Sequence, residues 1–158
     1  MGALDRTCSI LKEGGVKYDL IEHPEEFTAM AEASASGVAP REWAKSVAVR
    51  LDGRPALAVL PATRRLDVDR LAVVAGVQAV EIVPERELKA LYPDCDLGAI
   101  PPFGNLYDQS TFVDVALRED ELIGFHAGTH TETLVMAYPD FERIANAVPG
   151  RIALSAEE

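Results

Sequence analysis

Residues 42–61, EWAKSVAVRLDGRPALAVLP, contain two apolar runs joined by a short polar turn. Each run has the length of a β-strand, and the Asp-Gly pair between them is typical of a tight hairpin. Alternate side chains of a strand point to opposite faces, so Lys45 shares an apolar face with Trp43 and Val47. The stretch therefore predicts a β-hairpin that carries a lysine on its apolar face.

On both sides of this hairpin, apolar periodicity and capping residues predict further elements. We expect helices over residues 4–12, 29–35, 68–75 and 84–92 and after Pro139, and strands over 17–23, 79–83, 111–117, 121–126 and 131–136. Thr28 and Asp67 are the expected N-caps, and the run AVEIV at 79–83 is expected to be a buried strand. The pattern indicates a single α/β domain, residues 1–158, with a curved mixed β-sheet flanked by helices.

The composition excludes several classes of protein. The chain is 48% hydrophobic, with 26 acidic against 15 basic residues and a net charge of −11. No apolar run is long enough to span a membrane, and this charge disfavours broad binding to DNA or to an anionic membrane surface. The N-terminus does not resemble a secretory signal, and the two cysteines have no Cys-x-x-Cys partner. We therefore expect a soluble protein of the reducing cytoplasm.

Local contacts with nucleic acid remain compatible with the acidic balance. Arg41 with Lys45, and the pair Arg64 and Arg65, could each meet one or two phosphates. The plainer interpretation of these arginines is a solvated surface.

Lys45 is the first candidate for chemistry. Burial disfavours the charged form of an ammonium and lowers its pKa unless an anion compensates, so a lysine on an apolar face usually has a function. The alternative is a lysine at a strand end whose stem runs along the surface to water. A second candidate is the loop LGAIPPFGN at 97–105, whose glycines permit close backbone approach and whose prolines stiffen the chain. An ordinary tight connection would look similar.

The third candidate is FHAGTHTET at 125–133, where His126 and His130 precede Glu132. Gly128 and the strand-like surroundings do not allow the helical spacing of a His-Glu-x-x-His zinc site, so neither a metal nor any other cofactor is expected. A histidine beside threonines could bind or transfer a proton, or could be a satisfied residue at a strand end. His23, which precedes a proline, is expected in a surface or turn role.

These features together resemble the YbaK family, which is related to the editing insertion of bacterial prolyl-tRNA synthetases. The resemblance rests on a lysine that starts a central strand in AKSVAVRL, a Gly-x-x-x-Pro loop in GAIPPFG, and a histidine in the glycine-containing turn of GTHTET. It implies an α/β domain that hydrolyses the ester between a wrong amino acid and the 3′ end of tRNA, without a metal or an enzyme nucleophile.

By this resemblance Lys45, Gly98 and His130 match the catalytic positions. Substrate contacts are expected from the residues around them: Ser46, Ala99, Ile100, Pro101, Pro102, Thr131 and Met30. Met30 is a candidate for the pocket wall, although core packing is its more ordinary role. Ser46 stands where proline editors that remove alanine commonly have asparagine, so the amino acid specificity stays open among alanine, serine and cysteine.

The implied partner is the aminoacylated acceptor end of tRNA, with a synthetase or an elongation factor as a further partner. Two alternatives stay open from the residues. One is a non-catalytic module that binds an aminoacyl-like ligand or a translation partner, and the other is hydrolysis of a different small ester.

Overall fold

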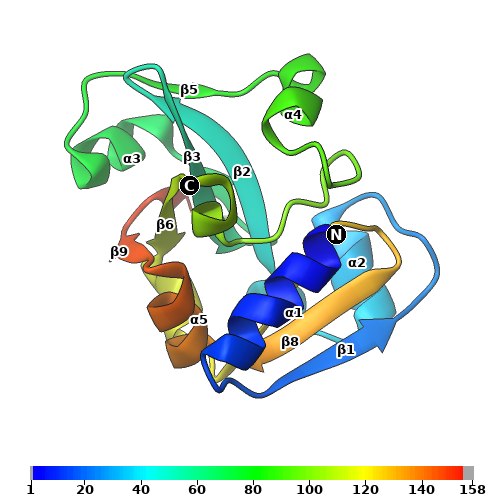
Figure 1. Cartoon of the computed structure of the whole chain (residues 1–158). Helices are drawn as coiled ribbons and strands as arrows, with labels where there is room; N and C mark the ends of the chain where they lie inside the picture. The colour runs from blue at the N-terminus through cyan, green and yellow to red at the C-terminus, as the bar shows by residue number, and fades with distance from the viewer. Residues whose placement is uncertain (1, 155–158) are drawn as a thin grey trace.

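The computed structural model describes residues 2–154, which form a mixed α/β domain (Figure 1). Within these residues the strands form a five-stranded sheet in the order β5-β2-β3-β6-β9, a three-stranded sheet β1-β8-β7 and a pair β10-β4. The strands are β1 Tyr18–Glu22, β2 Ala44–Leu51, β3 Arg54–Pro61, β4 Arg65–Leu66, β5 Val80–Ile82, β6 Ser110–Asp114, β7 Leu122–His126, β8 Glu132–Ala137, β9 Val148–Gly150 and β10 Ala153–Leu154. The helices are α1 Ala3–Glu13, α2 Ala29–Ser36, α3 Val68–Ala75, α4 Glu85–Leu91 and α5 Tyr138–Ala145, with short 3-10 turns at Pro40–Glu42, Gly104–Tyr107 and Val115–Glu119.

The predicted hairpin is the centre of the larger sheet. Strands β2 and β3 pair antiparallel from Ala44 opposite Pro61 to Leu51 opposite Arg54. Asp52 and Gly53 both have positive φ, 49° and 87°, which is the backbone that a two-residue turn of this kind needs. β6 and β9 then add in parallel, so the sheet is mixed, as predicted.

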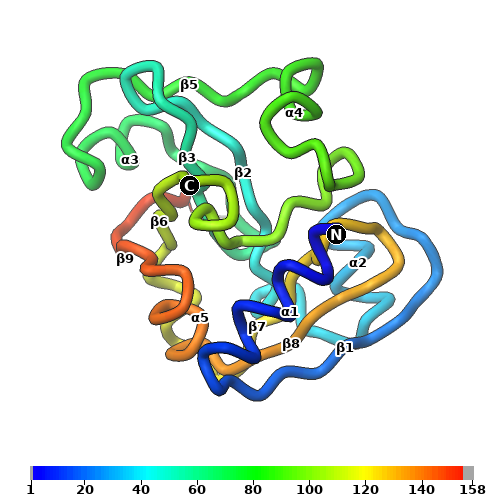
Figure 2. The backbone as a smooth tube through the Cα atoms, in the orientation of Figure 1, coloured from blue at the N-terminus to red at the C-terminus, as the bar shows by residue number. Residues whose placement is uncertain are grey.

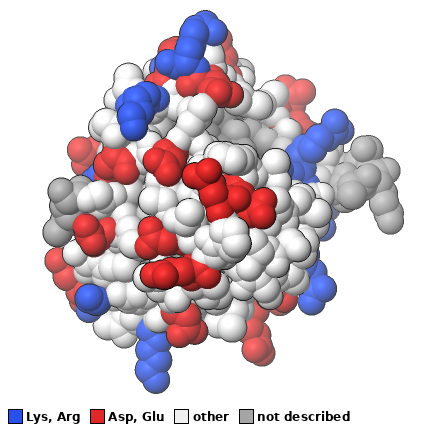
Figure 3. All heavy atoms as spheres, turned by 90° about the vertical axis from the view of Figure 1, so that its right-hand side faces the viewer, with Lys and Arg blue, Asp and Glu red and all other residues white. Residues whose placement is uncertain are grey.

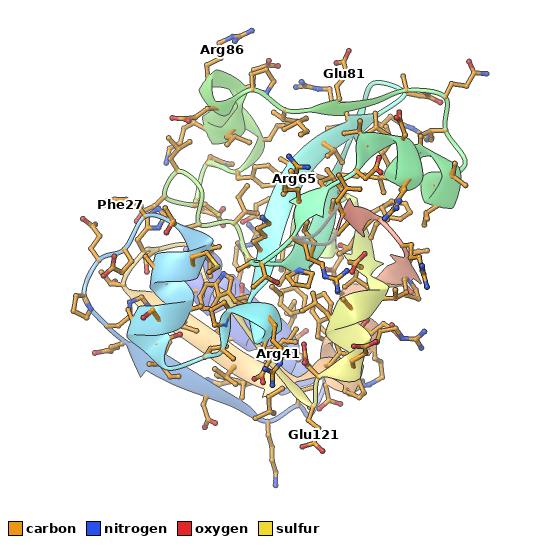
Figure 4. All side chains as sticks on the ribbon, turned by 180° about the vertical axis from the view of Figure 1, so that it is seen from behind. Phe27, Arg41, Arg65, Glu81, Arg86 and Glu121 are labelled. Carbon is orange, nitrogen blue, oxygen red and sulfur yellow. The ribbon has the colours of Figure 1, made fainter. Side chains whose placement is uncertain are left out.

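The smaller sheet lies beside the hairpin and carries helices on both sides. Figure 1 shows α1 in front of β8 and β1, and Figure 4, seen from behind, shows α2 over the other face. The two sheets meet where Trp43 bridges to Gly124 of β7. The tube in Figure 2 shows the start of α1 close to the turn between β7 and β8. Gly128 of that turn has φ +98°, and a Cβ there would lie 2.7 Å from the Cβ of Ala3, so the close approach requires glycine.

Two helix starts follow the predicted capping chemistry. The Thr28 side chain accepts a hydrogen bond from the N–H of Ala31, and the Asp67 carboxylate accepts from the N–H groups of Asp69 and Arg70. Each satisfies donors that a helix N-terminus leaves unpaired. Gly37 and Gly76 end these helices in the left-handed conformation.

The structure differs from the sequence predictions in the burial, length and number of its strands. The strand in AVEIV is not buried: β5 pairs with β2 alone, at the edge of the sheet, and Ile82 is 54% exposed. The strand expected over 111–117 ends at Asp114, because its carboxylate accepts from the N–H of Ala116 and starts a 3-10 turn. The short strands β4, β9 and β10 were not predicted. Across residues 2–154, no helix combines the length and apolar character that membrane crossing requires.

Candidate functional site

The loop at 97–102 packs against the turn between β7 and β8. The N–H of Asp96 donates to the Gly128 carbonyl at 2.8 Å, and the N–H of Gly128 donates to the Ala99 carbonyl at 2.9 Å. His130 adds a side-chain contact, since its Nε2 lies 2.7 Å from the Leu97 carbonyl oxygen. Two of the three predicted catalytic positions, Gly98 and His130, are therefore neighbours, although 32 positions separate them in the sequence.

Gly98 and Leu97 are the exposed members of this loop, and Gly98 is the one with an unusual backbone. Its φ of +80° lies in the left-handed region, and a Cβ added there would be 3.9 Å from Cε1 of His130, an ordinary contact distance. Among residues 2–154 the Gly98 N–H has no hydrogen-bond partner, whereas the N–H of Ala99 donates to the Asp96 carbonyl. Gly98 thus presents a free backbone donor beside the His130 ring.

The remaining predicted substrate residues fall into two groups. Ala99, Ile100, Pro101 and Pro102 are buried and form the inner part of the loop, with Ile100 in a core cluster that includes Ala48. Thr131 is exposed, and its carbonyl accepts from the N–H of His23. The more ordinary expectation for Met30, core packing, is wrong: the residue is 49% exposed on α2, because α2 turns Glu32 and Ala33 inward instead.

Lys45 lies at the start of β2 on the face predicted for it. Its neighbours on that face, Val47 and Val49, pack in the cluster around Leu71 of α3. Ala44 and Ala48 alternate with it, and Ala48 packs with Ile100, so the Lys45 side chain and the loop lie on opposite faces of β2. β5 pairs with β2 from Val49 onward, which leaves the edge at residues 44–47 uncovered by β5. The Lys45 side chain can approach the loop only around this edge.

The ammonium of Lys45 is half-buried and has no hydrogen-bond or ion-pair partner within the described chain. Burial disfavours its charged form, so the pKa of Lys45 is lowered from its usual value. Ser46, next in the strand, has a buried Oγ that also lacks a partner. Ser46 and Lys45 alternate along β2, so their side chains lie on opposite faces of the strand and Ser46 is on the side of the loop.

A second cluster lies directly behind His130 and centres on Glu32 of α2. The Glu32 carboxylate is fully buried and faces all three histidines of the chain. Its Oε1 lies 3.4 Å from Nδ1 of His126 and 3.5 Å from Nδ1 of His130, and its Oε2 lies 3.2 Å from Nε2 of His23. The His126 ring also packs edge-on against the buried Trp43. The cluster therefore links α2 to the end of β7, to the turn before β8 and to the start of the loop between β1 and α2.

This arrangement corrects the surface role expected for His23 and adds an acid that the sequence did not point to. His23 is not a surface residue, since its side chain is 2% exposed and reaches Glu32. The acid that joins His126 and His130 is Glu32 rather than Glu132, whose carboxylate accepts from the Thr129 hydroxyl. No sequence signal pointed to Glu32, because it lies 94 positions before His126 in an alanine-rich helix.

An exposed apolar patch surrounds the outer side of His130. Phe27 is 71% exposed and its ring centroid lies 5.2 Å from that of His130, while Leu97 is 50% exposed. Figure 4 shows Phe27 on the loop that leads into α2, pointing away from the body of the molecule. Single exposed apolar residues are common, but the Phe27 ring lies directly beside His130 of the candidate site.

Charge is distributed unevenly around the molecule. Figure 3 shows Asp and Glu side chains over the face formed by β1 and the loop after it, where Asp19, Glu22 and Glu25 are exposed. Arg41 and Arg64 line a common hollow of about 310 Å³, but Glu119 and Asp120 line it as well, so these four side chains carry no net positive charge. Figure 4 shows Arg41 and Arg65 on the face seen from behind. Lys45 does not line this hollow, and the lining residue Pro61 pairs across the hairpin with Ala44.

The cysteine near the loop is unsuited to nucleophilic chemistry. Cys95 borders a hollow of about 200 Å³ together with Gly98 and Ile100. Burial raises the pKa of its thiol to about 12, so the thiolate is scarce at neutral pH. Its Sγ lies 3.1 Å from the Tyr107 hydroxyl. Cys95 is therefore a packing residue with a polar contact.

The fold and the loop-histidine site define an α/β domain of the kind found in editing proteins. The chain belongs to the family described as the aminoacyl-tRNA editing domain, whose sequence profile matches residues 23–144. No curated protein sequence matches the chain.

Several solved structures share the fold. A putative trans-editing enzyme for prolyl-tRNA synthetase has a TM-score of 0.83 and 18% identity over 97% of this chain and 98% of that one. A protein described as hypothetical has a TM-score of 0.85 and 20% identity over 94% and 99% of the two chains. A putative signal transduction protein from Marinobacter aquaeolei VT8 has a TM-score of 0.74 and 18% identity, and the match spans 98% of this chain but 31% of that longer one. The predicted family and fold class are confirmed.

Proposed function

We propose that this protein is a trans-editing deacylase that hydrolyses the ester between a small, wrongly attached amino acid and the 3′ end of tRNA. Membership of the editing family supports the reaction class. The single observation that carries the proposal is the Gly98 N–H, a free backbone donor in an exposed left-handed residue that His130 holds in place from behind.

The Gly98 N–H is the proposed donor to the ester carbonyl. When water attacks that carbonyl, negative charge develops on its oxygen, and a donor already in position stabilises the charge without reorganisation. The ester bond then breaks, the ribose oxygen takes a proton and the free amino acid leaves. In this proposal no metal ion and no enzyme nucleophile touches the ester.

His130 is proposed to act on this reaction through the loop. Its Nε2 is engaged with the Leu97 carbonyl and its Nδ1 faces Glu32, so neither nitrogen is free to reach the substrate. His130 is therefore a positioning residue that holds the Leu97-Gly98 segment in place.

Phosphate contacts are proposed for the cations near the start of β2. The Lys45 ammonium lacks an anion, and Arg41 and Arg64 line a hollow at the end of β3, the strand that pairs with β2. A phosphate of the acceptor end would pair with a half-buried charge that now has no partner. Ser46 alternates with Lys45 along β2, so its buried Oγ is instead a candidate contact on the loop side of the strand.

The terminal adenine and the amino acid are proposed to bind on the side of the loop where Phe27 and Asp96 lie. Phe27 is exposed and could stack with an unpaired base, as aromatic residues do in RNA recognition. The acidic surroundings would attract the α-ammonium of the aminoacyl group, with Asp96 exposed next to the loop. The inner loop from Ala99 to Pro102 is closely packed, which favours small side chains such as those of alanine, serine or cysteine.

The two free cysteines fit the reducing cytoplasm, where translation occurs. A synthetase or elongation factor is the proposed protein partner, because the net charge of −11 leaves little attraction for tRNA.

The test is deacylation of a panel of tRNAs charged with alanine, serine, cysteine or their correct amino acids. We expect loss of the ester from at least one mischarged small amino acid and not from correctly charged tRNA. Binding of charged tRNA without any hydrolysis across the panel would instead support the alternative, a non-catalytic module.

A further inference from the structure

The buried cluster around Glu32 contains more acceptors than donors. Glu32 Oε1, His126 Nδ1 and His130 Nδ1 are all buried and lack a hydrogen-bond partner. Their side chains are 0%, 6% and 6% exposed, so bulk water does not satisfy them. An unsatisfied buried polar atom costs about 1–3 kcal/mol, and three of them converge here.

The hydrogen bond made by Nε2 of His130 determines which ring nitrogen carries the proton. His130 Nε2 faces a carbonyl oxygen, which can only accept, so Nε2 donates. In neutral His130 the other nitrogen, Nδ1, then holds a lone pair that points at the Glu32 carboxylate 3.5 Å away. Two lone pairs facing each other in a buried site repel, unless a proton or a metal ion lies between them.

The same pattern occurs at His23. Its Nδ1 lies 2.9 Å from the Pro24 carbonyl oxygen and therefore donates, which leaves Nε2 as an acceptor facing Oε2 of Glu32. The Thr133 hydroxyl lies 2.9 Å from that Nε2 and 3.5 Å from Oε2, and its single proton can satisfy only one of them. The partner that is missing from the cluster is thus a positive charge.

The spacing of the unsatisfied atoms fits a metal ion. Zn²⁺ binds His nitrogen and carboxylate oxygen at about 2.0–2.1 Å, so two ligand atoms of a tetrahedral site lie about 3.3 Å apart. Oε1 of Glu32 lies 3.4 and 3.5 Å from the two Nδ1 atoms, and all three ligand atoms lie within 4.8 Å of one another. A metal-bound histidine commonly donates its other N–H to a backbone carbonyl, as His130 does to Leu97.

We propose that Glu32, His126 and His130 bind a divalent transition-metal ion of the Zn²⁺ class, which stabilises the fold from inside. Because the three ligand side chains are almost wholly buried, the ion would be closed off from the ester, and a fourth ligand such as a buried water molecule would complete its tetrahedral shell. It would join α2 to the turn that holds the Gly98 loop. This proposal departs from the expectation of no metal, which rested on His126, His130 and Glu132.

The first test uses the tag-free full chain after treatment with a chelator, titrated with Co²⁺. Co²⁺ absorbs strongly in the visible region when its site is tetrahedral, and Zn²⁺ should displace it and abolish the bands. We expect saturation at one ion per chain and a rise in Tm with Zn²⁺, because an ion that binds only the folded state stabilises it. A parent chain with no visible bands and no change in Tm would overturn the proposal.

Variants locate the ion. Glu32→Gln should lose the Co²⁺ bands, while the matched control Glu132→Gln should keep them, because Glu132 contacts Thr129 and not the cluster. His126→Asn is a second ligand variant in case Glu32→Gln does not fold, which circular dichroism would show. Bands that persist in folded Glu32→Gln or His126→Asn would place the ion elsewhere and contradict the assignment. None of these readouts depends on deacylation, so the site and the proposed function can fail separately.

Discussion

Replacing Lys45 with methionine should lower deacylation and raise stability in the same variant. Methionine keeps most of the length of the side chain and removes its charge. If the ammonium binds a phosphate of the acceptor end, its loss removes one charge-assisted contact, about 1.5–3 kcal/mol. We therefore expect kcat/KM to fall by about 10- to 150-fold, since each 1.36 kcal/mol corresponds to a factor of ten.

The gain in stability follows from the half-buried, unpartnered ammonium. The charge costs desolvation that no anion offsets, whereas methionine buries apolar surface at no such cost. A gain of the order of one buried methylene, about 0.8 kcal/mol, is expected at neutral pH.

The gain should also depend on pH. The pKa of Lys45 is lowered in the folded protein from 10.5, so the folded state releases its proton before the unfolded chain does. Below the folded pKa both states are protonated and the penalty is fully present. As the pH rises from the folded pKa towards 10.5, the unfolded chain binds more protons and the parent becomes more stable relative to the variant. The advantage of methionine should therefore be largest at neutral pH and shrink as the pH nears 10.5.

The assay compares the parent, Lys45→Met and the control Lys12→Met, in which the same change is made at an exposed position of α1. Single-turnover deacylation gives the activity, and urea unfolding at several pH values gives the free energy of unfolding. The reasoning is refuted if Lys45→Met matches the parent in deacylation, or if it is less stable than the parent while Lys12→Met is not.

Three further changes test other parts of the site. Gly98→Ala and Gly53→Ala both place a Cβ on a left-handed backbone, with φ of +80° and +87°. Neither Cβ meets an atom closer than 3.9 Å, so each change should lower the free energy of unfolding by about 1–2 kcal/mol. Only Gly98→Ala should also lose deacylation. Because alanine keeps the backbone N–H, the loss is expected from the added Cβ, which would stand beside that N–H where the ester binds. Equal activity of the two variants would show that the ester does not approach Gly98 closely. Phe27→Ala should raise KM with little change in Tm, because stacking with a base contributes about 1–3 kcal/mol and the ring is 71% exposed; an unchanged KM would remove it from the site. Arg64→Ala should weaken tRNA binding and reduce the slope of log K against log salt by about 0.7, whereas Arg86→Ala, an exposed arginine of α4, should not change the slope.

Local signals in the sequence predicted most of the fold. The Asp-Gly turn, the Thr28 and Asp67 caps and the alternation around Lys45 each depend on neighbours a few residues away, and the structure has all three features. The edge position of β5 was missed, because the same apolar run can lie at the centre or the edge of a sheet and only long-range pairing decides.

The candidate site was less accessible from the sequence. Gly98 and His130 were singled out through the family resemblance, and their contact arises from hydrogen bonds between the loop and the β7–β8 turn. Glu32 and His23 could not be singled out, because they come together with His126 only when α2 packs over β7 and β8. The position of Lys45 on the face of β2 opposite the loop likewise depends on how the loop crosses the sheet.

The most direct test of the account is a crystal structure with an aminoacyl-adenosine analogue in which an amide replaces the ester. We predict that its carbonyl oxygen accepts from the Gly98 N–H and that its adenine lies on Phe27. An analogue bound away from the Gly98 loop, in crystals where that loop is free of neighbouring molecules, would contradict the central claim that this backbone donor receives the ester.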